Sequence, residues 1–90
     1  MEHKPLSQEQ VLYRQIDDIL WTEWDPIGIN DCEQARDEYY GYLPHVWRLK
    51  LQGADAETIA QYLFDVEIDR MGLNGDIEHC RKVANRIISL

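Results

Sequence analysis

Asp65, Glu67 and Asp69 are the residues whose types and spacing come closest to a catalytic pattern. Asp65 and Asp69 stand four residues apart, the spacing at which helical metal-dependent hydrolases place carboxylates on one inward face. On a helix, however, both project away from the apolar Leu63, so we expect them on a solvated face. The pattern therefore assigns no metal ligand.

Three charged residues fall on predicted apolar helix faces instead. Projected at about 100° per residue, Glu23 shares a face with Leu20, and both Glu67 and Arg70 share a face with Leu63. Burying a lone carboxylate is costly unless a partner or water compensates. We therefore expect these charges at helix ends, where the apolar face leaves the core. A Glu67–Arg70 ion pair and a buried acid–base carboxylate are the alternatives.

The histidines and cysteines form no recognisable metal or nucleophile motif. Cys32 and Cys80 belong to no CxxC pair, and the adjacent His79 and Cys80 would point about 100° apart on a helix. Cys80 lies on an apolar face and is expected to be a small core residue. Cys32 stands between two acidic residues, which disfavour a thiolate, so a Cys32–His45 catalytic pair is disfavoured too. The sequence assigns no catalytic residue and no cofactor.

The aromatic residues are a more informative signal than the titratable ones. The chain has three Trp and five Tyr but one Phe, a bias that suits a partly wet core or a partner surface. Trp21 projects off the apolar face of its predicted helix. The surplus either covers the loop at 26–29 or forms an exposed patch for a partner or a second copy of the chain. The residues assigned to such a patch are Trp21, Trp24, Tyr39, Tyr40 and Trp47.

The elements that must position these residues are all predicted to be helices, because apolar residues recur at helical spacing without strand alternation. Ser7 and Gln10 have the spacing of a capping box and begin the first helix. Asp25-Pro26 ends it, because proline drives the preceding residue out of the α region. Asp55 caps a later helix. The predicted helices span residues 8–24, 34–52, 56–71 and 76–89.

The second of these helices is the least clearly defined. Gly41 and Pro44 both disfavour a helix interior. Either a helix runs over 34–52 with an irregularity near Pro44, or a short turn precedes a helix that begins near residue 43. Short connections favour antiparallel neighbours, so we expect an all-α, compact four-helix array in a single domain of residues 1–90, with a flexible tail at 1–6.

Size and charge narrow the class of function. The chain has 90 residues, a formal net charge of −8 and a pI of about 4.6. Nucleic acids and anionic membranes attract positive proteins, so neither is expected as a partner, whereas a basic protein partner is compatible. No apolar run reaches the length of a membrane span, and the first residues do not resemble a signal peptide. We therefore expect a cytoplasmic protein with reduced thiols.

Two motifs resemble a family of small all-helical bacterial domains of unknown function. The first covers residues 19–29 and reads Ile-Leu-Trp-Thr-Glu-Trp-Asp-Pro-Ile-Gly-Ile. The second covers residues 37–44 and reads Asp-Glu-Tyr-Tyr-Gly-Tyr-Leu-Pro. The resemblance continues through Gly53 and residues 59–63, from about residue 11 to the end of the chain. It implies a compact intracellular domain, and it implies no activity, cofactor or catalytic residue.

The two motifs also have a physical interpretation. Asp25 can accept hydrogen bonds from the loop amides beyond Pro26, and Gly28 can adopt a positive φ. If the motifs meet in space, a tyrosine hydroxyl donates to Asp25 or Glu38 and joins the loop to the second helix in a structural clasp. The same groups could instead line a polar ligand cleft of Asp25, Asp37 and Glu38.

These observations predict a small acidic protein-interaction module without enzymatic activity, which binds a partner through its aromatic residues. One alternative is a small-molecule-binding protein or minor enzyme that uses the cleft at Asp25, Asp37 and Glu38. Another is a homo-oligomeric structural protein whose surplus aromatic residues meet a second copy. Burial of Trp21 and Trp47 within one chain would remove the main support for the aromatic surface.

Overall fold

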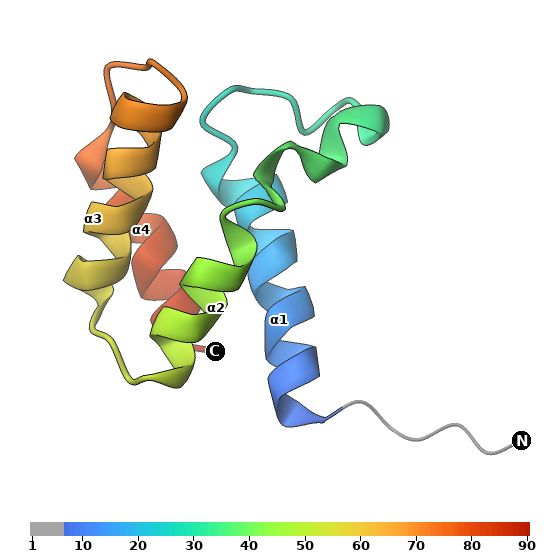
Figure 1. Ribbon diagram of the computed structural model, residues 1–90, viewed down its shortest axis with the longest axis vertical. Coiled ribbons are helices and arrows are strands. Elements are labelled where there is room, and N and C mark those ends of the chain that lie inside the picture. Colours follow the sequence, from blue (N-terminus) through green and yellow to red (C-terminus); the bar gives the residue numbers. More distant parts are fainter. Residues whose placement is uncertain (1–6) are drawn as a thin grey trace, which may run out of the picture.

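The computed structural model describes residues 7–90, in which every regular element is a helix and none is a strand (Figure 1). The all-α prediction is therefore confirmed. The tail expected at 1–6 lies outside the described residues. In chain order the elements are α1 (Gln8–Ile19), the π-helical turn η1 (Leu20–Trp24), the 3₁₀ helix η2 (Glu33–Tyr39), α2 (Leu43–Leu51), α3 (Ala56–Asp65), the π-helical turn η3 (Val66–Arg70) and α4 (Ile77–Ile88).

Side chains close the N-terminal ends of three helices. At α1 the capping box is complete, because Gln10 N donates to Ser7 Oγ at 3.1 Å and Ser7 N donates to Gln10 Oε1 at 3.0 Å. Asp55 Oδ1 accepts from Thr58 N at 2.8 Å, and Asp76 Oδ1 accepts from His79 N at 3.1 Å. Each bond satisfies a backbone donor that has no partner within its own helix. The predicted starts of α1 and α3 are thus confirmed.

The second predicted helix divides in two. A continuous helix over 34–52 is wrong, and the alternative of a short turn before a helix from residue 43 is close to the observed arrangement of η2 and α2. Pro44 stands in the first turn of α2. Proline lacks a backbone N–H and clashes with the carbonyl four residues earlier, so it fits a helix start and not a helix interior.

Both α1 and α3 end in a π-helical turn. Asp25 N donates to Leu20 O at 3.1 Å and Met71 N donates to Val66 O at 3.0 Å, each across five residues. A π turn places one more residue in the turn than an α-helix does. Side chains in and after it therefore depart from a projection at 100° per residue.

The core lies where the four α-helices and η1 meet. Figure 1 shows α3 and α4 side by side, with α1 packed on α2, and the segment from 25 to 42 (cyan to green) lying at the η1 end of α1. The largest fully buried side chains come from all five elements: Ile16, Leu20, Trp24, Val46, Ile59, Leu63, Cys80, Val83 and Ile87. None of the helices in 7–90 combines the length and apolar character that crossing a membrane requires.

Candidate functional site

The loop that follows η1 is organised around Asp25. This residue has a left-handed backbone with φ of 30°, which aspartate tolerates better than most residues. Its Oδ1 accepts from Ile29 N at 2.8 Å and its Oδ2 from Asn30 N at 3.3 Å. Tyr39 Oη donates to the same Oδ1 at 2.7 Å and accepts from Ile27 N at 3.3 Å. The expected tyrosine clasp is therefore present, and its acceptor is Asp25.

The clasp shifts the titration of its tyrosine. Burial raises the pKa of Tyr39 well above its ordinary value, and the hydrogen bond to Asp25 raises it further. The phenol therefore stays protonated and keeps donating. Asp37 and Glu38 are exposed on η2, and neither lines the hollow that Asp25 lines. The structure thus does not assemble the polar cleft predicted from Asp25, Asp37 and Glu38.

The five aromatic residues assigned to a partner surface do not share one exposed face. Trp21, Trp24 and Tyr39 are at most 3% exposed and belong to the core. The Tyr39 ring lies 5.3 Å from Trp24 and 6.0 Å from Trp21, measured between centroids. Trp21 was expected off the apolar face of its helix, and it is nevertheless buried because η2 covers that side. Arg36 of η2 pairs with Asp17 at 3.3 Å and lies 5.7 Å from the centroid of the Trp21 ring.

The remaining two aromatic residues lie apart from that cluster. Tyr40 is 44% exposed. Trp47 is half-buried, packs edge-on against Tyr13 at 5.1 Å and donates from Nε1 to Glu9 O at 3.0 Å. Of the predicted partner-binding set, only these two side chains retain contact with solvent. An aromatic-rich surface is therefore not the feature that the fold presents.

A buried polar junction joins η1, η3 and α4 at Glu67, which is 2% exposed. Its Oε2 accepts from Trp24 Nε1 at 2.7 Å and from Cys80 Sγ at 3.1 Å, and its Oε1 accepts from Asp76 N at 2.9 Å. No ion pair within residues 7–90 includes Glu67. The expected position at a solvated helix end and the Glu67–Arg70 pair are both wrong, because three internal donors replace water around this carboxylate.

Two further groups complete the buried polar junction. Burial raises the pKa of the Cys80 thiol far above its ordinary value, and the hydrogen bond to Glu67 adds to the rise, so the thiol remains a donor. His79 Nε2 lies 2.7 Å from Glu23 O and 3.1 Å from Trp24 O. Both neighbours are acceptors, so Nε2 carries the proton and satisfies carbonyls at the end of η1. Sequence spacing predicted neither role, since each depends on a residue more than ten positions away.

The buried polar junction borders a hollow of about 330 Å³ that Asp25, Asp76 and His79 also line. These polar groups are already hydrogen-bonded within the protein. In the part of the chain that the structure describes, no three His, Cys, Asp or Glu side chains are placed to hold a metal ion. The junction therefore has the character of an internal brace that joins three elements.

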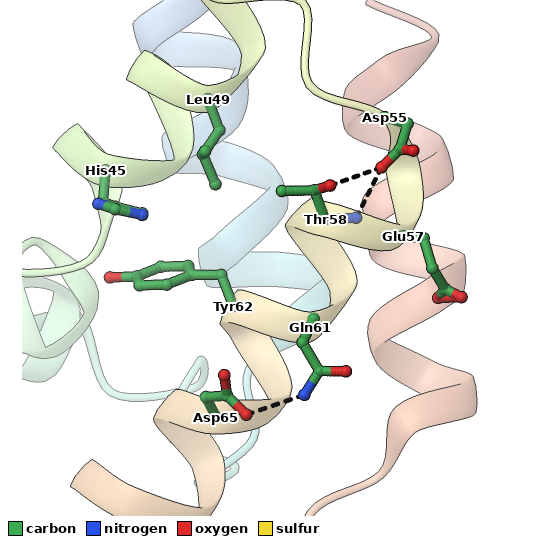
Figure 2. Close-up of a pocket in the computed structure, with 8 residues that line it drawn as sticks. All are labelled: His45, Leu49, Asp55, Glu57, Thr58, Gln61, Tyr62 and Asp65. Atoms are coloured by element: carbon green, nitrogen blue, oxygen red, sulfur yellow. Dashed lines mark hydrogen bonds between the residues drawn. The ribbon is translucent and has the colours of Figure 1, made fainter.

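An open groove lies between α2 and α3, and its polar side chains are exposed, in contrast to the buried Glu67 (Figure 2). It has a volume of about 620 Å³. Figure 2 shows Tyr62 extending from α3 towards His45 on α2, and the two rings stack with centroids 4.1 Å apart. The groove is lined by His45, Leu49, Asp55, Glu57, Thr58, Gln61, Tyr62 and Asp65. We call this hollow the α2–α3 groove.

The polar groups of the α2–α3 groove are mostly exposed, whereas Leu49 and Tyr62 are half-buried. Three carboxylates line it and differ in their partners. Hydrogen bonds from Thr58 hold the pKa of Asp55 below its usual value. Glu57 pairs with Arg81 at 3.0 Å. Asp65 Oδ1 accepts only from the neutral Gln61 amide, at 2.9 Å (Figure 2). The groove thus combines a stacked aromatic pair with an exposed carboxylate.

Comparison with known proteins adds no identification: no family model, no curated protein and no solved structure matches the chain. The resemblance to a bacterial helical family therefore stays a prediction from its two motifs.

Proposed function

We propose that this protein is an interaction module without enzymatic activity, and that it binds a segment of a partner protein in the α2–α3 groove. The observation that carries the proposal is the His45–Tyr62 stack, which stands in an open hollow among polar groups that water can reach. Tyrosine is enriched in protein interfaces because it offers a large, stiff contact area with a polar end.

The shape of the α2–α3 groove supports a peptide-like partner. A hollow between two helices suits an amphipathic helix or an extended segment, which places apolar side chains inside and polar groups at the rim. The half-buried Leu49 and Tyr62 offer apolar surface. The exposed Thr58 and Gln61 stand in the same lining, each donating to a neighbouring carboxylate. The buried polar junction has no comparable exposed groups, since its donors and acceptors meet one another inside the protein.

A screen of a random peptide display library against the full chain tests the proposal. We expect selected peptides to lose affinity about tenfold or more in Tyr62→Ala. Tyr40→Ala removes an exposed tyrosine outside the α2–α3 groove and serves as the matched control. Retained melting temperatures in both variants establish that each still folds.

Two results would contradict the proposal. One is equal loss of binding in Tyr40→Ala and Tyr62→Ala, which would place the peptide elsewhere. The other is a library from which no binder emerges. The molar mass of the free chain in solution separates this proposal from the alternative of self-association, because a stable homo-oligomer at low concentration would favour a structural role.

A further inference from the structure

Resting on the proposed function, we infer that the segment bound in the α2–α3 groove is cationic. An arginine or lysine of the partner pairs with Asp65 beside the Tyr62–His45 stack. The chain as a whole supports this charge preference, since its formal net charge is −8. A negative surface steers positively charged partners towards it and repels acidic ones.

The balance of charge at the α2–α3 groove points the same way. Its lining contains three carboxylates, those of Asp55, Glu57 and Asp65. Among the described residues, the only ion pair that these carboxylates form is between Glu57 and Arg81, and Arg81 also pairs with Glu78. Arg70 stands close enough to Tyr62 to oppose the rise in the pKa of that phenol, although it does not line the groove.

Asp65 is the carboxylate best placed for a partner's cation. Asp55 holds the first turn of α3 and Glu57 holds Arg81, whereas Asp65 is exposed and accepts only from a neutral amide. Asp65 and Tyr62 stand three residues apart on α3 and so lie on adjoining parts of its surface.

Arginine fits this arrangement better than lysine. A planar guanidinium pairs with a carboxylate through two N–H groups and also stacks on an aromatic ring. A single arginine of the bound segment can thus pair with Asp65 and lie against the Tyr62 ring, and Glu57 is not required.

Three peptides on one scaffold test the inference, with arginine, glutamine or glutamate at the position that faces Asp65. Each is titrated into the full chain, with amide chemical shifts to locate binding and calorimetry to measure affinity. We expect the arginine peptide alone to bind, to shift resonances of the α2–α3 groove, and to weaken as salt rises.

Asp65→Asn should lower the affinity of the arginine peptide about 5- to 20-fold. Asp37→Asn removes the same charge from an exposed carboxylate on η2 and is the matched control, with a change below about twofold.

Each contrary outcome has its own meaning. If the glutamine or glutamate peptide binds the α2–α3 groove as tightly as the arginine peptide, the cationic preference is overturned and the proposed function stands. If Asp37→Asn weakens binding as much as Asp65→Asn, the pairing at Asp65 is overturned in favour of a long-range charge effect. If no peptide of any charge shifts groove resonances, the inference and the proposed function both fail.

Discussion

Asp65 and Glu67 stand two residues apart on the same helical segment, and their carboxylates have opposite surroundings. Asp65 is exposed and accepts one hydrogen bond, from a neutral amide. Glu67 is buried and accepts three, from a side chain of η1, a side chain of α4 and the backbone N–H of the residue that caps α4. The π turn η3 begins at Val66, between the two. Two acids so close in sequence can thus lie one on the surface and one in the core. The buried carboxylate is the one with more hydrogen-bond donors from the same chain.

The buried polar junction and the α2–α3 groove differ in the same way as these two carboxylates. In the buried polar junction every group is satisfied by another group of the same chain, so nothing remains to hold a ligand. In the α2–α3 groove the polar side chains are exposed, and the stacked pair joins an exposed His45 to a half-buried Tyr62. Perturbing each region should therefore change a different observable: stability for the first, affinity for the second.

The largest effect is expected from Glu67→Ala. Removing this carboxylate leaves the Trp24 indole N–H, the Cys80 thiol and the Asp76 N–H without their acceptor. We expect the free energy of unfolding to fall by about 3–5 kcal/mol, measured by urea denaturation. Asp65→Ala is the control and should change it by less than about 0.5 kcal/mol. Equal losses in the two variants would abolish the contrast between them.

A smaller loss is expected from Tyr39→Phe, which removes only the hydroxyl of the clasp. Asp25 loses one donor and Ile27 N loses its acceptor, while the ring keeps its contacts with Trp21 and Trp24. We expect a loss of about 1–2 kcal/mol in unfolding free energy. Tyr40→Phe at an exposed site should be neutral. A neutral Tyr39→Phe would show that the clasp adds no stability.

Cys80 predicts how stability depends on pH. Because the folded pKa of its thiol lies above the unfolded value of about 8.5, the unfolded chain releases the proton first. The stabilisation is complete below about pH 8.5 and declines as pH rises, by up to about 1.4 kcal/mol per pH unit. Cys80→Ala should flatten this slope between about pH 8.5 and 10, whereas Cys32→Ala, at an exposed thiol, should leave it unchanged. Unfolding free energies at several pH values measure both slopes.

The smallest change in stability is expected from His45→Ala. The imidazole is exposed and contributes one stacked contact with Tyr62, so we expect a loss of about 0.5 kcal/mol or less. The same variant should weaken peptide binding in the α2–α3 groove severalfold, which titration of a selected peptide measures. A variant that loses much stability without losing affinity would assign the stack to the core.

Much of the fold could be predicted from local sequence signals. Ser7, Asp55 and Pro44 act on donors, acceptors and backbone angles within a few residues, so their effects can be inferred from spacing alone. The clasp between Asp25 and Tyr39 could also be anticipated, because both motifs are rich in groups that form turns and hydrogen bonds.

Tertiary structure alone decided which polar and aromatic side chains are buried and which are exposed. Projection at about 100° per residue places Glu67 on the face of Leu63 and Trp21 off the apolar face. It cannot show that η2 covers Trp21, or that three donors from other elements surround Glu67. The α2–α3 groove unites His45 with Tyr62 across 17 positions of sequence, a separation that no local pattern reports. The sequence by itself determined the all-helical class and the starts of the capped helices, because caps and turns act locally. Which carboxylate is buried and which faces solvent depends on what packs against each helix face.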